Sequence, residues 1–324
     1  MSKGRSLALV MLAYVIAVAV GIGWLCWGPR TGRLWLDTLI ADLLATGVVF
    51  VFSRAYRNSS FYDAYWSVIP PLLAFYWWSQ GPMGPGSGDS SGTNSLRIWL
   101  LAAVMTFWAV RLTANWAHLF SGLNHEDWRY PILRDGAGRF EFLADLFGIH
   151  LFPTLQVFVG MLPVYVALTR PGDGVVWLTW VAFAVGIAAV SVELIADRQM
   201  QRFVASAGPG SVMDRGLWAW SRHPNYVGEI GFWFSMALFG VAVSPRDAWW
   251  LFAGVALMIA MFLGASIPLM EKRSLERRPQ YQGVIDRVPK LIPRPPRPDR
   301  TGPDRTGPDR TGPDRTGPDR TGPA

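Results

Sequence analysis

Apolar runs long enough to cross a lipid bilayer, or nearly so, recur along most of this sequence. About 20 apolar residues in an α-helix span the hydrocarbon core of a bilayer. Eight runs approach this length, and they lie at residues 7–27, 34–53, 61–79, 96–117, 149–168, 175–196, 226–243 and 248–268. The third and the seventh fit the criterion least well. The sequence therefore predicts an all-α fold, a polytopic membrane bundle of about seven or eight transmembrane helices.

The composition also departs from that of an ordinary soluble domain. Of 324 residues, 51% are hydrophobic, only 16% are charged, and 17 are tryptophan. The first run follows Lys3 and Arg5 and has no small-residue cleavage site behind it, so we expect an anchor and not a signal peptide. Cys26 is the single cysteine, which excludes an intramolecular disulfide and a thiolate metal cluster within one chain.

Basic residues are concentrated in alternate connections between the runs. If the N-terminus is cytoplasmic, the outer connections keep only five arginines: Arg30, Arg33, Arg97, Arg170 and Arg246. The positive-inside rule then places both termini in the cytoplasm. The net charge of +7 suits anionic lipid or a phosphorylated cofactor. We expect no nucleic-acid partner, because no soluble domain or basic helix is available to enter a groove.

Two parts of the chain differ in kind. Residues 1–292 form the predicted membrane domain, and residues 293–324 form a tail in which the unit PDRTG occurs five times from Pro298 to Gly322. The repeat has no apolar side chain to bury, and its Asp and Arg charges balance, so we expect disorder. A functional tail remains open, but a low-complexity repeat without catalytic meaning is the favoured interpretation.

The segment SRHPNYVGEI at residues 221–230 places polar groups at the start of an apolar run. Pro224 fits the first turn of a helix, where its missing N–H costs nothing. One face of that helix would carry Arg222, Tyr226 and Glu229, with Asn225 beside them. A helix N-terminus with cationic donors suits an anion such as a phosphate group. The alternative is a membrane-surface cap in which Arg222 meets lipid headgroups.

Polar residues gather in four segments at the expected inner ends of the helices, at 108–130, 193–202, 215–229 and 271–290. A phosphorylated cofactor that enters from the cytosol would account for all four. The sequence has no GxGxxG after a strand, no Walker motif, no HExxH and no paired-cysteine spacing. Its four histidines, His118, His125, His150 and His223, are too dispersed to predict a metal site.

Asp63 lies near the start of the third run, between Tyr62 and Tyr65. One interpretation is an aromatic belt at the membrane interface with an acidic helix cap. The other is a buried carboxyl that donates a hydrogen bond to a carbonyl substrate, alone or through a tyrosine hydroxyl.

Four segments resemble the steroid 5α-reductase and sterol-reductase superfamily of membrane enzymes, above all its bacterial branch. They are Arg111 after an aromatic run, EDWRY at 126–130, ADRQ at 196–199 and RHPNYVGE at 222–229. The resemblance covers roughly residues 108–292. The RHPNY-x-GE motif is shared with isoprenylcysteine carboxyl methyltransferases, whose C-terminal glutamate, tyrosine and VP-x-x-IP ending are similar to Glu271, Tyr281 and VPKLIP at 288–293.

The resemblance implies a helical fold whose C-terminal helices and cytosolic loops, at about 108–292, enclose NADPH. Asn225 and Glu229 would contact the nicotinamide end. Ribose and phosphates would be held by Arg111, Arg129, Tyr130, Asp197, Arg222 and Tyr226, and the predicted cofactor site also includes Arg198, Arg202, Arg215 and His223. In the reductases a tyrosine and a glutamate polarise the substrate carbonyl. Here those positions hold Trp108 and Asp63, so we expect Tyr62 or Tyr65 to supply the acidic hydroxyl.

The expected activity is that of an NADPH-dependent oxidoreductase of the 3-oxo-5α-steroid 4-dehydrogenase type, which acts on CH–CH groups. Hydride would pass to the C=C bond of an α,β-unsaturated ketone in a lipophilic, steroid-like substrate, and Asp63 would stabilise the enolate oxygen. Two alternatives remain. One is a methyltransferase similar to the isoprenylcysteine enzymes, which uses S-adenosylmethionine, and the other is a non-catalytic lipid-binding membrane protein.

Overall fold

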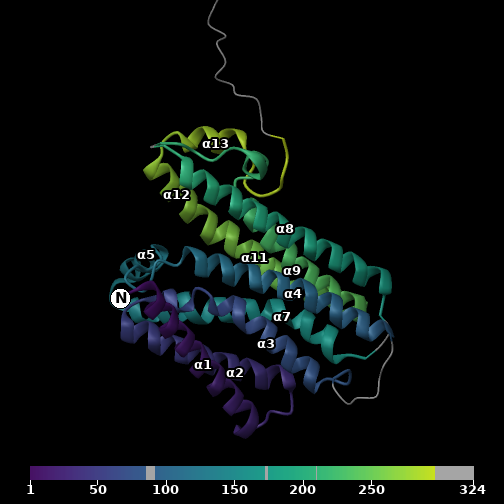
Figure 1. Cartoon of the computed structure of the whole chain (residues 1–324). Coiled ribbons are helices and arrows are strands. Elements are labelled where there is room, and N and C mark those ends of the chain that lie inside the picture. Colours follow the sequence, from purple (N-terminus) through teal and green to yellow (C-terminus); the bar gives the residue numbers. More distant parts are fainter. Residues whose placement is uncertain (85–91, 172–173, 209, 296–324) are drawn as a thin grey trace, which may run out of the picture.

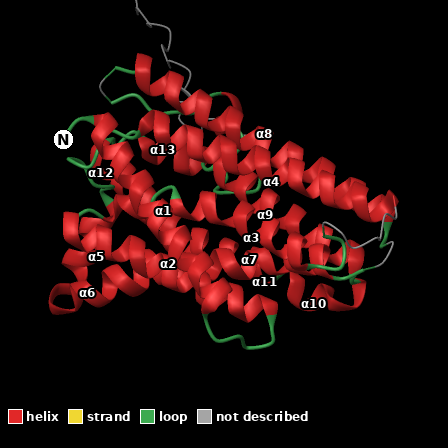
Figure 2. Cartoon of the chain, turned by 60° about the horizontal axis from the view of Figure 1, so that its bottom comes forward, coloured by secondary structure: helices red, strands yellow, loops and turns green. Residues whose placement is uncertain are grey.

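The computed structural model describes residues 1–84, 92–171, 174–208 and 210–295. Within these ranges the chain is helical and contains no strand, as Figure 2 shows. The predicted all-α fold is thus confirmed. The prediction of a disordered tail concerns residues that lie outside the described ranges, apart from 293–295.

The first half of the chain forms four long helices. These are α1 (Lys3–Trp27), α2 (Leu34–Tyr56), α3 (Tyr65–Gln80) and α4 (Gly92–Leu119), and a short 3₁₀ turn, η1 (Ser59–Tyr62), precedes α3. Asp63 therefore lies between η1 and α3, at the end of the bundle. The connection after α4 contains two short helices, α5 (Arg129–Ala137) and α6 (Glu141–Leu143), and the π-helical segment η3 (Ala144–Leu151).

The second half contains α7 (Phe152–Thr169), α8 (Val176–Ser206) and α9 (Pro224–Val243). The expected last span is a series of segments: α10 (Ala248–Leu251), α11 (Ala253–Met261), the π-helical η6 (Phe262–Ser266) and α12 (Ile267–Arg277), followed by α13 (Tyr281–Arg287). Helix α8 continues ten residues beyond its expected end at 196. That extension carries the polar segment 197–202 on a helix.

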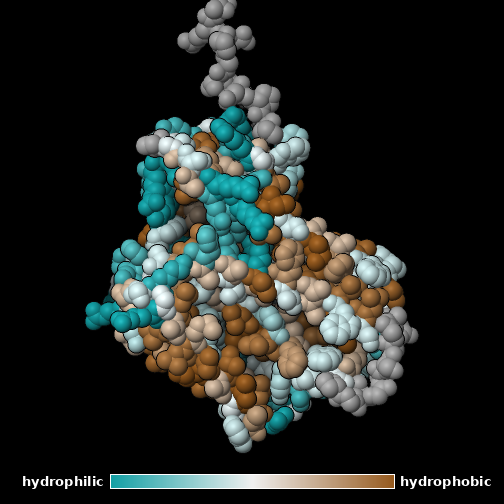
Figure 3. Space-filling model, in the orientation of Figure 1, coloured by the Kyte–Doolittle hydropathy of each residue, from teal (hydrophilic) through white to brown (hydrophobic). Residues whose placement is uncertain are grey.

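Among the described residues, seven stretches are long and apolar enough to cross a membrane. They include α9, the seventh expected run. Helix α3 is not among them, because it has only 16 residues. It packs against α4 and α7 instead. Figure 3 shows apolar residues over the body of the molecule and polar residues gathered where α12 and α13 project.

The N-terminus and the C-terminal helices lie at the same end of the bundle (Figure 1). Lys3 Nζ donates to the carbonyl oxygen of His118, at the end of α4, across 3.0 Å. The guanidinium of Arg273, in α12, lies 3.8 Å from the ring centroid of Trp128, just before α5. This common end carries the polar segments and is called the polar end below. Its orientation in a cell stays a prediction.

Small residues bring α8 and α9 close together, as is common in membrane bundles. A Cβ placed on Gly228 would come within 2.7 Å of both the Ala189 carbonyl oxygen and the Glu193 Cβ. The close approach brings the side chains of Glu193 and Glu229 into one buried region between α4, α8 and α9. Packing between glycine and backbone thus determines where the acidic groups lie.

Candidate functional site

Asp63 and Tyr130 form a short hydrogen bond at the polar end. The Tyr130 hydroxyl, in the first turn of α5, donates to Asp63 Oδ1 across 2.5 Å. Burial raises the pKa of Asp63 to about 7, although the bond from Tyr130 acts in the opposite direction. The carboxyl is therefore partly protonated near neutral pH, and it can either donate or accept a hydrogen bond.

The hydroxyl groups of Tyr62 and Tyr65 bond to residues other than Asp63, contrary to the expectation that one of them supplies the acidic hydroxyl beside it. The Tyr62 hydroxyl lies 2.7 Å from Thr154 Oγ1, in α7, and the Tyr65 hydroxyl donates to Asp42 Oδ1, in α2, across 2.9 Å. Both tyrosines face into the bundle and are buried. Asp63 faces the connection between α4 and α5, so its partner is Tyr130, a residue expected to contact cofactor.

Arg129 is bound by the neighbouring Asp127. Its Nε donates to Asp127 Oδ1 across 2.8 Å, and its Nη2 donates to Oδ2 across 3.0 Å. Burial tends to raise the pKa of Asp127, but these bonds hold it below its ordinary value. Arg129 also lies close enough to Asp63 to lower the pKa of that carboxyl. Asp63, Tyr130, Asp127 and Arg129 thus form one cluster.

The indole N–H of Trp108 is hydrogen-bonded to Glu229. Its Nε1 donates to Glu229 Oε2 across 3.0 Å, and Trp233 Nε1 donates to the other oxygen across 2.8 Å. Trp108 is fully buried and stacks on Phe232, with 4.3 Å between ring centroids. Since an indole has a single N–H donor, Trp108 can bind a substrate carbonyl only by leaving Glu229.

Arg111 lies between two acidic residues of α8. It forms ion pairs with Glu193 and Asp197, and its Nη1 donates to Asp197 Oδ2 across 2.7 Å. Asn115 Nδ2 donates to the same Asp197 oxygen across 3.3 Å. Arg111 Nε and Glu193 Oε2 are buried and have no hydrogen-bond partner. The charge of Arg111 is thus neutralised within the protein, and a phosphate would have to compete with two carboxylates.

A groove of about 480 Å³ runs between α4 and α8 beside this ion-pair cluster. Its α4 wall includes Phe107, Val110 and Arg111, and its α8 wall includes Asp197 and Arg198. Three of the residues predicted to bind cofactor thus share one groove. Its volume falls within the range of small-molecule sites.

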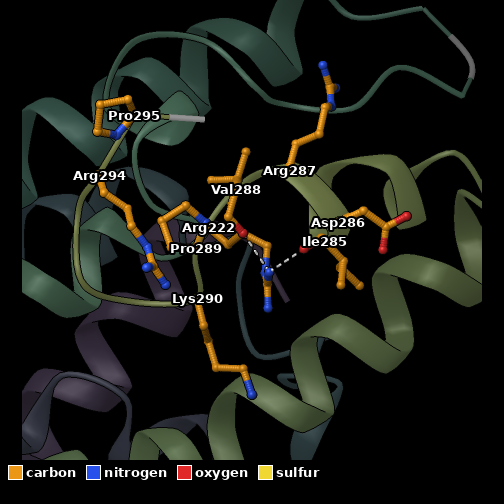
Figure 4. A pocket seen from close by; sticks show the side chains of 9 residues that line it. All are labelled: Arg222, Ile285, Asp286, Arg287, Val288, Pro289, Lys290, Arg294 and Pro295. Atoms are coloured by element: carbon orange, nitrogen blue, oxygen red, sulfur yellow. Dashed lines mark hydrogen bonds between the residues drawn. The ribbon is translucent and has the colours of Figure 1, made fainter. Parts of the chain in front are cut away.

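The motif at the start of α9 holds the C-terminal helices in place. Helix α9 begins at Pro224, as predicted from the position of this proline. Arg222 Nε donates to Glu271 Oε1, in α12, across 2.7 Å, and His223 Nε2 lies 3.2 Å from the same oxygen. Arg222 Nη1 donates to the carbonyl oxygens of Ile285 and Val288 (Figure 4). Arg222 and His223 therefore have structural partners, and their predicted cofactor contacts stay predictions.

Asn225 and Tyr226 follow on the first turn of α9. Asn225 Oδ1 is buried and has no hydrogen-bond partner, which is unusual for a buried amide oxygen. The Tyr226 ring is stacked between His223 and Phe262, with centroid distances of 5.3 and 4.2 Å. Phe262 opens the π-helical segment η6, a type of segment found frequently at functional sites. Electrostatic interactions link Tyr226 to Arg129, Asp127 and Asp197.

Two predicted cofactor residues lie apart from these clusters. Arg202 and Arg215 are exposed and line neither the groove between α4 and α8 nor the pocket drawn in Figure 4. The other predicted cofactor residues and Asp63 fall into three groups at the polar end: Asp63 with Arg129 and Tyr130, Arg111 with Asp197 and Arg198, and Arg222 to Glu229.

Several polar residues of these groups were not predicted as site residues. Asp127 and Glu271 hold Arg129 and Arg222, and Asp42 binds Tyr65 inside the bundle. Asp42 carried a signal in the sequence, because an acidic residue inside an apolar run is expensive and usually functional. The pairing of Arg222 with Glu271 had no local signal in the sequence, since 49 positions separate the two residues.

Comparisons with known proteins identify the family of this chain. A model of the family described as "Protein of unknown function (DUF1295)" matches residues 49–288. A protein of Schizosaccharomyces pombe, "Uncharacterized protein C594.04c", is 28% identical over 284 residues, which covers 79% of this chain and 78% of that protein. No solved structure gives a significant match. The chain therefore belongs to the DUF1295 family, which is related to the steroid 5α-reductase-like membrane proteins.

Proposed function

We propose that the protein is an NADPH-dependent membrane oxidoreductase that reduces a C=C bond conjugated to the carbonyl group of a lipophilic, steroid-like substrate. The observation that carries the proposal is the bond of 2.5 Å between Tyr130 and Asp63. It places an acidic pair at the polar end of an apolar bundle, next to the Arg129 and Asp127 cluster.

Asp63 and Tyr130 would polarise the substrate carbonyl. A carboxyl with a pKa of about 7 holds a proton in part of the molecules at neutral pH. Either the carboxyl or the Tyr130 hydroxyl can then donate a hydrogen bond to the carbonyl oxygen as negative charge develops on it. One well-placed donor of this kind is commonly worth roughly 3 kcal/mol. NADPH, when bound, would supply the hydride for the β-carbon, and water or a protonated side chain would supply the proton for the α-carbon.

Asn225, Tyr226 and Arg129 support the choice of a nicotinamide cofactor. The free Asn225 Oδ1 is a buried acceptor that suits the N–H₂ of a carboxamide. Tyr226 offers its hydroxyl beside Arg129, and Arg129 retains donors that suit phosphate oxygens. Asn225 and Tyr226 start a helix, and a helix N-terminus favours an anion. The residues present thus fit the group.

The groove between α4 and α8 supports a lipophilic substrate. Val110 lines it and is 62% exposed, so its mouth borders the surface that faces lipid. Arg111 and Asp197 lie in the wall of the same groove. A lipophilic substrate would therefore enter this groove from the bilayer, with its polar group directed toward the polar end, where Asp63 and Tyr130 lie.

A second candidate is methyl transfer from S-adenosylmethionine. One observation favours it: Glu271 binds both Arg222 and His223, and Tyr281 lies near this pair. Those residues are the ones that resemble the isoprenylcysteine enzymes. The Asp63 and Tyr130 pair has no evident part in methyl transfer, which is why reduction is the first choice.

The test is cofactor binding by the full chain, purified in a mild detergent. Thermal stability is measured with NADPH, NADH and S-adenosylmethionine, because a ligand at 100 times its Kd adds about 2.7 kcal/mol. Stabilisation by NADPH, followed by enone-dependent NADPH oxidation, is the expected result. Stabilisation by S-adenosylmethionine alone would replace reduction with methyl transfer. No response to any of the three would point to the non-catalytic lipid-binding alternative.

A further inference from the structure

A second pocket lies within the C-terminal lobe, which we define as α12, α13 and residues 288–295. Its volume is about 260 Å³, and it is lined by Arg222, by residues 285–290, and by Arg294 and Pro295. The pocket is separate from the groove between α4 and α8, with which it shares no lining residue. It is drawn in Figure 4.

Arg222 provides a fixed cationic wall. It is only 7% exposed, and its guanidinium is held by Glu271 and by the carbonyl oxygens of Ile285 and Val288. These bonds use Nε and Nη1. Figure 4 shows the second terminal nitrogen pointing away from the two carbonyl groups. One edge of a rigidly held guanidinium thus remains available in the pocket that the side chain lines.

Lys290 and Arg294 add two cations without acidic partners. In the described part of the lobe, the ion pairs of Arg222 and Arg287 are with Glu271 and Asp214, and neither Lys290 nor Arg294 belongs to an ion pair. In Figure 4 both point to the same side as the free edge of Arg222, whereas Arg287 points the opposite way.

The backbone that carries these cations is fixed to the loop before α9. The Arg222 N–H donates to the Pro289 carbonyl oxygen across 2.9 Å, and the Arg294 N–H donates to that of Trp220 across 3.1 Å. Pro289 and Pro295 further restrict the chain. The backbone at Lys290 and Arg294 is therefore held in place before any ligand binds, although their side chains are exposed.

We propose that this pocket binds a phosphate group through Arg222, Lys290 and Arg294. Arginine and lysine together are the usual partners of phosphate oxygens. A pocket of about 260 Å³ accommodates a phosphate with an attached sugar or glycerol, but not a whole dinucleotide. The group comes either from the phosphorylated cofactor, in which case the inference rests on the proposed function, or from an anionic lipid headgroup.

The test compares two charge-matched double variants of the full chain in a zwitterionic detergent. Lys290→Gln with Arg294→Gln removes the two unpaired cations of the pocket. Arg277→Gln with Arg278→Gln removes two exposed cations at the C-terminal end of α12 that do not line the pocket. All four residues are exposed, so both variants should fold, and matching melting temperatures without ligand check this. Binding is measured for NADPH, NADH, dioctanoyl phosphatidic acid and dioctanoyl phosphatidylcholine.

We expect the pocket variant to bind NADPH or phosphatidic acid tenfold more weakly than wild type, and the control variant to change less than twofold. If the pocket variant binds NADPH more weakly but binds NADH and phosphatidic acid as wild type does, the phosphate group comes from the cofactor. Loss confined to phosphatidic acid identifies lipid, and this result stands even if NADPH does not bind at all. The inference would be overturned if the two variants bind NADPH equally well and also bind phosphatidic acid equally well. It would also be overturned if wild type binds neither NADPH nor phosphatidic acid. If wild type binds NADPH and both variants bind it equally well, the proposed reductase function stands without a contribution from this pocket to cofactor binding.

Discussion

Tyr130 donates a hydrogen bond of 2.5 Å to Asp63 across 67 positions of sequence, and this bond joins the start of α5 to the start of α3. It places a carboxyl and a phenol side by side in a partly buried site at the polar end. Because the carboxyl has a pKa of about 7 there, a small change in its surroundings changes its protonation. Three of the following predictions test this pair.

Asp63→Ala should lower kcat for enone reduction by about 100-fold, the usual cost of losing one donor to a developing oxyanion. NADPH affinity should change little, because Asp63 itself is not among the residues proposed to bind the cofactor. Tyr130→Phe should act in the same direction. Tyr62→Phe is the matched control, since its hydroxyl bonds to Thr154 and not to Asp63. Full activity of the Asp63 variant would remove the carboxyl from the site.

Activity should depend on pH through the protonation of Asp63. If the protonated carboxyl donates to the substrate, kcat/KM falls as pH rises through about 7, the pKa that burial gives this group. The measurement is kcat/KM between pH 5.5 and 9, for wild type and for Asp63→Asn. The variant should not show this fall of kcat/KM. If the fall persists at the same pH in the variant, a group other than Asp63 causes it.

Stability should respond to the same titration. The folded-state pKa of Asp63 lies above the unfolded value of about 3.9, so the folded state binds the proton more tightly. The stabilising contribution is complete below about pH 4 and is lost as pH rises to about 7. Melting temperature in detergent should therefore fall more with pH in wild type than in Asp63→Asn. Parallel curves would contradict the assigned pKa.

The sequence predicted the individual helical segments better than it predicted the contacts between residues of different segments. The apolar runs, the start of α9 at Pro224 and the i+4 spacing of Glu193 and Asp197 follow from local patterns, and the helices confirm them. The partner of Asp63 does not follow from a local pattern. Tyr62 and Tyr65 were the nearest tyrosines in sequence, but each turns inward from its own helical segment.

The same limit applies to charges. Arginines in the polar segments suggested phosphate contacts, yet Arg111, Arg129 and Arg222 each bind a carboxylate of the protein. In two of the three pairs the acid comes from another helix. Only the packing of α4 on α8, and of the loop before α9 on α12, brings those groups together. Spacing along one chain segment cannot predict such contacts.

The ion pairs of Arg111 should stabilise the fold. Arg111→Met would leave Glu193 and Asp197 without their cation in a buried region, and losing one partner of a buried pair costs about 3 to 5 kcal/mol. Arg198→Met is the control, because Arg198 is an exposed neighbour in the same groove. The measurement is chemical denaturation in detergent. Equal stability of the two variants would mean that the Arg111 cluster is kept for ligand binding alone.

Glu271 should hold the C-terminal lobe on the bundle. Its Oε1 accepts from Arg222 and lies 3.2 Å from His223, so Glu271→Gln weakens the contact that joins α12 to the loop before α9. Hydrogen exchange of α13 and of the chain up to residue 295 should increase, whereas exchange in α2 and α3 stays unchanged. Glu276→Gln is the control, because Glu276 is an exposed residue of the same helix. If α13 exchanges equally in both variants, the lobe is held by the other contacts, which are the bonds of Arg222 Nη1 to Ile285 and Val288 and the backbone bonds of residues 289–294, and not by Glu271.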